Sequence, residues 1–346
     1  MNVSDIILLS GVAGLSTKEI EDLMNQSKNE TLKMVLKSLD RDIVRKILKA
    51  VEEAIEKLGM VIITYWDDLY PEPLRSISSP PPVLYVCGDG IDTLSREPKI
   101  GIVGSRKCTY YGRSVARKLA EELAAMNFVV VSGLAAGIDS AAHEGAASAG
   151  GTIGVLGNGV DVIYPSYNAR MYELVKEHGC VVSEFPPGTP PMKHHFPMRN
   201  RIISGLSLGV IVVEAGEKSG ALITARMARE QGREVFAVPG PVTSGASRGT
   251  NALIKNGAKL VQNVWDVVEE FPWLKLDTNR VGGNKGNGIE LSEGEQRVLE
   301  RIRLGDDTLD MLLTTTDMKM EEILTYLTFL EMKGLVKETG GRYVAL

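Results

Sequence analysis

The stretch KIGIVGSRK, residues 99–107, joins a short apolar run to a turn of small residues and two cations. Residues 99–103 have the length and β-branched content of a buried strand, and Gly104 and Ser105 follow where a strand would lead into a helix. Small residues at such a junction let backbone N–H groups and a helix N-terminus contact an anion, and Arg106 can bind a phosphate through two nitrogens. A tight turn with an exposed arginine is an equally good interpretation of this stretch alone.

The pattern that begins at residue 99 continues as far as residue 238. Short β-branched runs alternate with amphipathic helical stretches, which predicts βαβ units and therefore an α/β fold with a parallel sheet covered on both faces. In such sheets ligands bind beyond the carboxyl ends of the strands. We expect strands at 99–103, 128–132, 152–156, 180–183, 209–214 and 234–238, and helices at 112–126, 138–149, 168–177 and 220–231.

The segments before residue 99 differ in kind. The first 60 residues show helical apolar spacing and predict a small helical domain. Residues 9–15 resemble a helix-hairpin-helix turn only faintly, and a structural helical cap is the alternative. Residues 65–98 are rich in proline, which supplies no ladder N–H, so they predict an extended connector leading into an edge strand.

A second module is expected after a Gly- and Asn-rich stretch that follows Trp273. Ser292 and Glu295 have capping-box spacing, and three helices followed by a Gly-Gly hairpin suggest a winged helix. Its third helix, 317–333, carries more acids than bases, which is unfavourable along phosphates and favours protein contact or a structural role. The predicted domains are 1–64 (helical), 65–275 (α/β), 276–289 (linker) and 290–346 (winged helix).

The net charge of −5 is unevenly distributed. Residues 290–346 contain 12 acids and 7 bases, so the whole acidic excess lies in this module and the remainder is neutral. Two windows contain no acid: 98–120 has six Lys or Arg, and 185–213 has three together with two His. These windows are candidate anion-binding surfaces, because local charge matters more than its sum.

Several classes of protein are disfavoured by the sequence. No apolar run is long enough for a membrane span, and the N-terminus lacks the basic region of a secretory signal, so we expect a cytoplasmic protein. Three dispersed cysteines without C-x-x-C spacing argue against a disulfide framework or a zinc site. Nucleotide-binding glycine motifs are also absent, and His143, Asp139 and Asp161 are better explained by packing or helix capping than by catalysis. We therefore predict no cofactor, no metal and no catalytic residue.

The stretch KHHFPMRNRIISG, residues 193–205, places one phenylalanine among five cationic or titratable side chains. An aromatic ring offers a nucleobase a stacking face, while nearby Lys and Arg hold the strand's backbone. The alternative is that Phe196 is a core residue at the start of a helix and that Arg199 and Arg201 form salt bridges. The residues alone leave both interpretations open.

Ordered motifs between about residues 80 and 271 resemble those of the DNA-processing protein A family (DprA, also called Smf). Its members have an extended Rossmann-like fold, so the resemblance implies that fold here, flanked by a small helical domain of the SAM or helix-hairpin-helix type and by a winged helix. The matching residues are Gly104-Ser105-Arg106, Ser132-Gly133, Gly137-Ile138-Asp139, Ala142-His143, Tyr164-Pro165, Phe196-Pro197, Arg199-Asn200-Arg201, Glu214, Ser219-Gly220, Thr224-Ala225, Val238-Pro239-Gly240 and Gly257-Ala258.

The resemblance also implies a function. Family members bind single-stranded DNA without a known catalytic step, protect incoming strands during natural transformation and load the RecA recombinase, usually as homodimers. By this resemblance Arg106, Lys193 and Phe196 hold the strand, and Arg199 and Asn200 support them. The full set of DNA-binding residues that we expect is Gly104, Ser105, Arg106, Lys193, Phe196, Arg199, Asn200, Arg201, Ser219 and Gly220.

One pair of residues departs from the family pattern, and two other functions are alternatives to DNA binding. His194 and His195 stand where family patterns often have Gly-Ser; they are expected either to crowd the loop or, once charged, to tighten binding below about pH 6.5. A hydrolase of nucleotide N-glycosidic bonds is a second hypothesis, with Glu214 and Arg106 as its residues, although the P-G-G-x-G-T-x-x-E loop of such enzymes is missing. A scaffold that docks proteins through its acidic module is a third.

Overall fold

A computed structural model describes residues 2–25, 29–274, 276, 291–303, 305–316, 318–333, 335–339 and 342–345. The chain divides into two compact units, 1–281 and 282–346, which are considered separately below. The predicted linker, 276–289, lies outside the described residues apart from Leu276.

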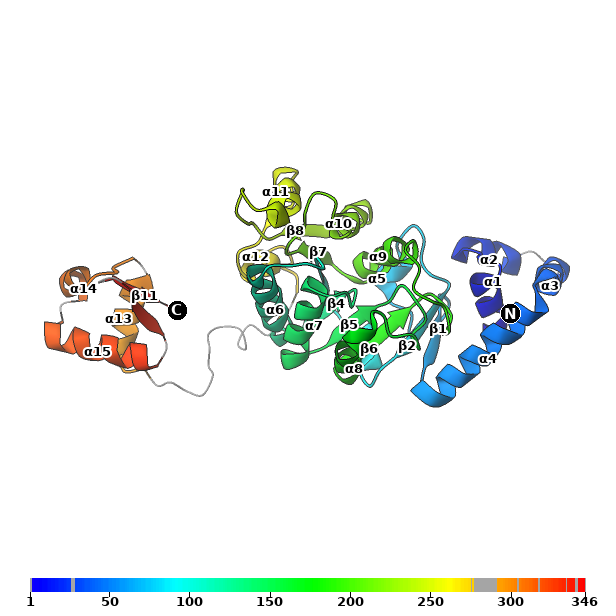
Figure 1. The fold of residues 1–346 in the computed structure, drawn as a ribbon, viewed down its shortest axis with the longest axis horizontal. Helices are drawn as coiled ribbons and strands as arrows, with labels where there is room; N and C mark the ends of the chain where they lie inside the picture. The colour runs from blue at the N-terminus through cyan, green and yellow to red at the C-terminus, as the bar shows by residue number, and fades with distance from the viewer. Residues whose placement is uncertain are drawn as a thin grey trace. The chain divides into compact units, whose positions relative to one another are not determined.

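The first unit is built on a nine-stranded sheet with the strand order β1-β2-β6-β5-β4-β3-β7-β8-β9 (Figure 1). From β6 to β9 all neighbouring strands are parallel, as the alternating pattern predicted. The six expected strands are β3 to β8, each within two residues of the predicted bounds. The strands are β1 (Val61–Thr64), β2 (Val83–Cys87), β3 (Lys99–Val103), β4 (Val129–Ser132), β5 (Thr152–Val155), β6 (Gly179–Ser183), β7 (Gly209–Val212), β8 (Glu234–Ala237) and β9 (Lys259–Leu260).

The prediction of an edge strand after the proline-rich segment was wrong. β2 is internal, because it pairs antiparallel with β1 on one side and with β6 on the other. The edge strand is β1, which lies within the segment predicted to be helical. Four residues are too few to show a strand period, and it is the pairing of Val61 with Val86 through Thr64 with Val83 that makes β1 a strand.

Helices cover both faces of the parallel strands, and alternate strand residues point to opposite layers. Val210 and Val212 of β7 pack with α5 (Glu72–Arg75), α9 (His195–Leu206) and α10 (Ala221–Glu230). Ile211, between them, packs with α6 (Tyr110–Ala125), α7 (Ile138–Ala149) and α12 (Trp265–Val268) on the other face. The helices α8 (Ala169–Glu177) and α11 (Arg248–Lys255) also belong to this unit.

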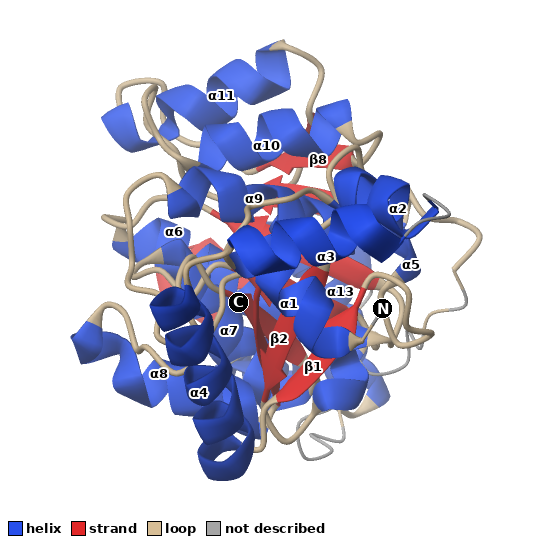
Figure 2. Ribbon diagram, turned by 90° about the vertical axis from the view of Figure 1, so that its right-hand side faces the viewer, coloured by secondary structure: helices blue, strands red, loops and turns tan. Residues whose placement is uncertain are grey.

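The N-terminal helices pack on the β1–β2 end of the sheet. They are α1 (Val3–Gly11), α2 (Thr17–Asn25), α3 (Asn29–Ser38) and α4 (Arg41–Leu58). Ile6 and Ile7 of α1 and Val51 of α4 share one apolar cluster with Val83 and Tyr85 of β2, and Figure 2 shows α1 in front of these strands with α4 beside them. The helical segment is therefore part of the same compact unit as the sheet.

The second unit has three helices followed by a two-stranded antiparallel ribbon. The elements are α13 (Glu293–Arg303), α14 (Leu309–Thr316), α15 (Met320–Met332), β10 (Val336–Thr339) and β11 (Arg342–Ala345). Its core includes Val298, Leu312 and Ile323. The residues of the predicted Gly-Gly turn lie outside the described ranges.

In the part of the chain that the structure describes, none of the helices has the length and apolar character that crossing a membrane requires.

The N-terminus of α6, expected from the sequence to face an anion, is closed by a carboxylate of the chain itself. Glu214, which follows β7, is 3% exposed. Its Oε2 accepts a hydrogen bond from the Thr109 N–H at 2.8 Å, and its Oε1 accepts one from the Thr109 hydroxyl at 2.5 Å. Thr109 in turn caps α6 by accepting from the N–H of Gly112. The Glu214 carboxylate therefore interacts with the N-terminal end of α6 within the protein, and anion binding by the turn before it stays a prediction.

Gly112 leaves the space that Glu214 occupies, because a Cβ at this position would lie 2.4 Å from the Glu214 Cδ. Gly112→Ala should therefore lower the free energy of unfolding by about 1–3 kcal/mol, the usual cost of overpacking, although alanine is the better helix former. Urea denaturation of the full chain measures this change. The control is Ser114→Ala on the exposed side of α6, which should be neutral or slightly stabilising. A stabilised Gly112→Ala variant would contradict the contact.

Candidate nucleic-acid interface

A cleft of 820 Å³ opens at the carboxyl ends of β3 and β7. The chain runs outward from β3 through β4, β5 and β6 and then returns to β7 on the other side, so the strand order reverses between β3 and β7. Open α/β sheets bind their ligands at such a switch point. The cleft is lined by the loop after β3, the loop after β7 with the start of α10, the first turns of α9, and Asp139 of α7.

Nine of the ten residues predicted to bind DNA line this cleft, and Arg201 does not. The structure thus brings together two regions about 90 residues apart in sequence, the turn after β3 and the start of α9. The nine are Gly104, Ser105, Arg106, Lys193, Phe196, Arg199, Asn200, Ser219 and Gly220.

Arg106 and Phe196 form a stacked pair at the edge of the cleft. The guanidinium carbon of Arg106 lies 5.3 Å from the centre of the Phe196 ring, a cation–π distance. Phe196 is half-buried, and the ring of Tyr164 packs beside it with centroids 5.8 Å apart. Phe196 is therefore neither a plain core residue nor a free side chain; it is a supported ring with a cation against it.

Arg199 lies beneath the cleft as a buried structural cation. Its Nη1 donates to the carbonyl oxygens of Gly133, at 2.9 Å, and Val155. Burial lowers the pKa of Arg199 to about 10, so the guanidinium stays charged at neutral pH. A Cβ on Gly133 would lie 2.7 Å from the Arg199 Nη2, which is why this position needs glycine.

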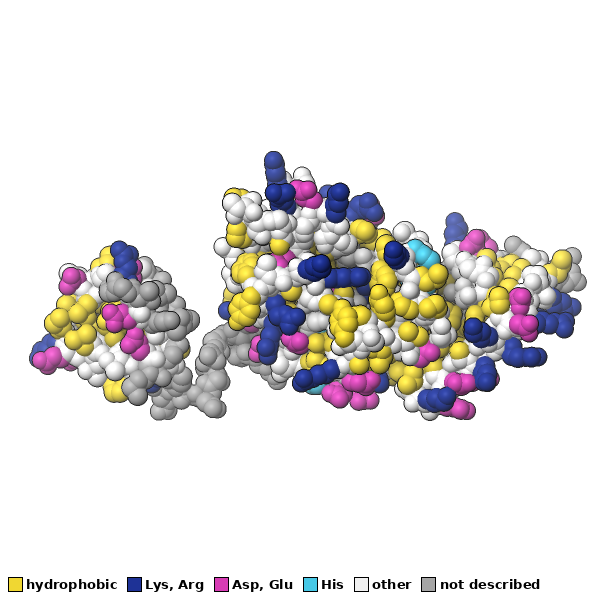
Figure 3. Space-filling model, viewed as in Figure 1, with side chains coloured by type: hydrophobic (Ala, Val, Ile, Leu, Met, Phe, Trp, Pro, Cys, Tyr) yellow, Lys and Arg dark blue, Asp and Glu magenta, His cyan; other side chains and the backbone are white. Residues whose placement is uncertain are grey.

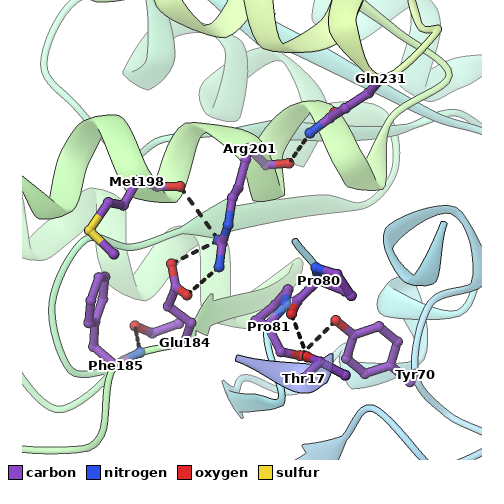
Figure 4. A network of polar contacts seen from close by, with 10 residues as sticks. Thr17, Tyr70, Pro80, Pro81, Glu184, Phe185, Met198, Arg201 and Gln231 are labelled. Atoms are coloured by element: carbon purple, nitrogen blue, oxygen red, sulfur yellow. Dashed lines mark hydrogen bonds and ion pairs between the residues drawn. The ribbon is translucent and has the colours of Figure 1, made fainter. Parts of the chain in front are cut away.

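Arg201 points away from the cleft into a different network (Figure 4). Its guanidinium forms two parallel hydrogen bonds with the Glu184 carboxylate, at 2.9 and 2.6 Å, and its carbonyl accepts from Gln231. Both side chains of the ion pair are largely buried. Arg201 thus fastens α9 to the segment after β6, and its charge is neutralised there.

Asp139 is the one acid among the residues that line the cleft, which include five Lys or Arg. Burial raises the pKa of Asp139 from 3.8 to about 6, against the opposing influence of the Arg199 charge. Its Oδ2 also accepts weakly from the N–H of Ala135 at 3.4 Å. The five cations are Arg106, Lys107, Lys193, Arg199 and Lys218.

The two histidines before Phe196 have different environments. His195 is buried, stacks on Phe185 with centroids 4.0 Å apart, and its Nδ1 lies 3.1 Å from the carbonyl oxygen of Gly157. Burial lowers the pKa of His195 below its usual value, which makes it a poorer cation near pH 6.5 than a free imidazole. His194 is exposed and touches His195 edge-on. His195 packs the base of α9 rather than serving as a pH-dependent cation.

Among the residues of the cleft that were not predicted, four are charged or aromatic: Lys107, Asp139, Tyr164 and Lys218. The acid-free window 98–120 already contained Lys107, and Tyr164 stood in a motif without an assigned role. Lys218 had no sequence signal, because two glutamates precede it within four residues. In Figure 3, Lys and Arg side chains are gathered in the middle of one face of the first unit, between the positions of α6 and α9.

The hydrolase hypothesis required the Glu214 carboxylate beside a substrate. Glu214 instead caps α6 through Thr109 and does not line the cleft. Its partner in that hypothesis, Arg106, lies on Phe196. Among the described residues, no three His, Cys, Asp or Glu side chains are grouped so as to hold a metal ion.

Comparison with known proteins identifies the family. The sequence model described as DNA recombination-mediator protein A matches residues 61–272. The chain is 45% identical over 251 residues to the DNA processing protein DprA of Bacillus subtilis, covering 69% of this chain and 84% of the relative. It is 40% identical over 370 residues to the protein Smf of Synechocystis, covering 97% and 89%.

Two solved structures are similar as well. DNA processing protein A of Streptococcus pneumoniae matches with a TM-score of 0.63 at 40% identity, over 73% of this chain and 86% of that one. The Helicobacter pylori protein, whose structure is described as giving insights into a unique single-stranded DNA binding mode, matches with a TM-score of 0.56 at 31% identity, over 62% and 96%. With a family match over more than half of its length, the chain belongs to the DNA recombination-mediator protein A family, whose curated relatives are named DprA or Smf.

Proposed function

We propose that this protein binds single-stranded DNA in the cleft between β3 and β7, without a catalytic step, and acts as a recombination mediator. The observation that carries the proposal is the half-buried ring of Phe196 with the Arg106 guanidinium against it, in a cleft lined by five cations. Aromatic rings stack nucleobases and cations hold phosphates. The structure of the Helicobacter pylori relative, described as giving insights into single-stranded DNA binding, also supports a single strand as the ligand.

The geometry favours a single strand over a duplex. A base can lie against Phe196 only if it has left the base stack, because the ring is half-buried and flanked by Arg106 and Tyr164. Paired bases present only their edges to a protein. The cleft offers Arg106 and Lys193 for the phosphates on either side of such a base. Affinity should therefore depend little on sequence and strongly on salt.

Family membership supports a wider role, which is part of the same proposal. The protein would protect incoming strands and load the RecA recombinase onto them in the cytoplasm, as in natural transformation, and act as a homodimer. The 290–346 module, with three helices and an antiparallel ribbon, would be a winged helix. Its net charge of −5, from 12 acids and 7 bases, suits contact with a protein better than with DNA.

Arg106→Ala and Phe196→Ala should weaken binding to an oligo-dT strand in different ways. Loss of Arg106 removes a phosphate contact, so the slope of log affinity against log salt should become shallower by about 0.7. Loss of Phe196 removes stacking, so affinity should fall about 5- to 100-fold with the salt slope kept. Fluorescence anisotropy over a salt series measures both effects. Arg117→Ala, an exposed cation of α6 outside the cleft, is the control and should bind like the parent.

A result in which both variants bind like the parent would reject this cleft as the DNA site. Failure of the parent itself to bind any single strand at low salt would reject the function. Tighter binding of duplex than of single strand would reject the stacking argument while leaving the cleft as an anion site.

Affinity should rise as the pH falls through about 6, the pKa to which burial raises the Asp139 carboxyl. Above that pH Asp139 is charged and repels phosphates in the cleft, so binding is accompanied by proton uptake. The gain cannot exceed about tenfold per pH unit, because one group takes up one proton. Asp139→Asn should bind more tightly than the parent at pH 7.5 and show little change down to pH 5.5. Anisotropy at fixed ionic strength measures both.

The exposed His194 provides the control for this experiment. His194→Gln should keep the pH dependence of the parent if Asp139 is its source. A pH dependence that survives in Asp139→Asn but disappears in His194→Gln would transfer the effect to the histidine.

A further inference from the structure

A second, smaller cavity of 270 Å³ lies directly beside the cleft. We call it the slot; it is lined by the loop 133–136 after β4, by Pro165 and Tyr167, and by residues it shares with the cleft. Residues that line two neighbouring cavities lie between them, so the shared set forms a ridge. The ridge residues are Arg106, Lys107, Ala135, Tyr164, Phe196 and Arg199.

The slot is rich in accessible aromatic surface. Tyr167 is 76% exposed and Tyr164 is 45% exposed. Neither hydroxyl has a hydrogen-bond partner among the described residues. Together with Phe196, which packs beside Tyr164, they place three rings around the ridge. Exposed rings next to a cation-lined cleft are the residue types that single-strand binding proteins use to stack bases.

The floor of the slot is held in place by contacts that order it before any ligand arrives. The Asn168 side-chain amide donates to the carbonyl oxygen of Leu134 at 2.9 Å and so ties the turn that carries Tyr167 to the loop. Leu134 has a φ of +54°, a conformation that costs energy for a residue with a side chain and is kept by its surroundings. Arg199 and Asp139 hold Gly133 and Ala135 from below. A rigid wall reduces the entropy lost when a ligand is ordered against it.

Ala136 in the wall has two backbone polar groups that could recognise a ligand, its N–H and its carbonyl oxygen. Ala136 lines the slot, and among the described residues neither its N–H nor its carbonyl oxygen has a hydrogen-bond partner. A nucleobase edge carries both donors and acceptors. The slot therefore combines a stacking surface with a lining residue whose backbone donor and acceptor have no partner among the described residues.

From this arrangement we propose that the slot is a second base-binding subsite, in which a nucleobase next along the strand stacks against Tyr167 and Tyr164. The strand would cross the ridge, with one base at Phe196 on the cleft side and another in the slot, and Arg106 and Lys107 at the backbone between them. The protein then grips two unpaired bases rather than one. This inference depends on the proposed function, because it extends the same binding path.

The experiment compares Tyr167→Ala with Tyr167→Phe in binding to an oligo-dT strand and to an all-abasic strand of equal length. Tyr167→Ala should weaken binding to oligo-dT about fivefold or more with the salt slope unchanged. Tyr167→Phe should bind like the parent, since the ring is retained. On the abasic strand all three proteins should bind equally, because it has no base to stack. Tyr110→Ala, an exposed tyrosine that lines neither cavity, is the matched control and should behave as the parent.

Tyr167 is exposed, so its truncation should not affect folding, and an unchanged thermal midpoint checks this. Equal loss on the oligo-dT and abasic strands would mean that Tyr167 acts on the backbone and would overturn the subsite. Parent-like binding of Tyr167→Ala, alongside weakened Phe196→Ala, would overturn the subsite and leave the proposed function standing. If the parent protein itself bound no single strand, the result would reject the proposed function, and the subsite with it.

Discussion

The buried guanidinium of Arg199 is the interaction on which the candidate site depends. It joins α9 to the ends of two neighbouring parallel strands through the carbonyl oxygens of Gly133 and Val155. A charged group removed from water must have its donors satisfied or it destabilises the fold. For Arg199 the compensation is partial: Nη1 donates to strand-end carbonyls and the Asp139 charge is nearby, whereas the buried Nε has no hydrogen-bond partner among the described residues. Because α9 carries Phe196 and Asn200, this bonding fixes where they meet the turn after β3.

Two carboxylates, those of Glu214 and Glu184, bind partners within the protein and do not line the cleft. Glu214 occupies the N-terminus of α6, so the helix end that often receives a phosphate in related folds is already filled. Glu184 neutralises Arg201 and anchors the far side of α9 (Figure 4). Of the five cations around the cleft, Arg199 lies beside Asp139, whereas no ion pair with a carboxylate is found for Arg106, Lys107, Lys193 and Lys218 among the described residues. This arrangement suits an extended polyanion better than a single nucleotide.

The ridge lies between the cleft and the slot, so a strand that occupied both cavities would cross it. Both cavities have cations and aromatic rings in their lining, because Arg106, Lys107, Tyr164 and Phe196 line both; Lys193 and Lys218 belong to the cleft alone and Tyr167 to the slot alone. The loop 133–136 joins the two cavities, because it is held from below by Arg199 and Asp139 and from the side by Asn168.

By itself the sequence determined the alternation of strands and helices, the parallel sheet and, through its motifs, the family. These features are local periodicities and ordered residue patterns, which need no knowledge of distant contacts. Only the tertiary structure decided that β1 is an edge strand, that Arg201 pairs with Glu184 outside the cleft, and that His195 is buried with a lowered pKa. Each of these outcomes rests on a partner far away in sequence, and a side chain's charge, exposure and role are set by that partner.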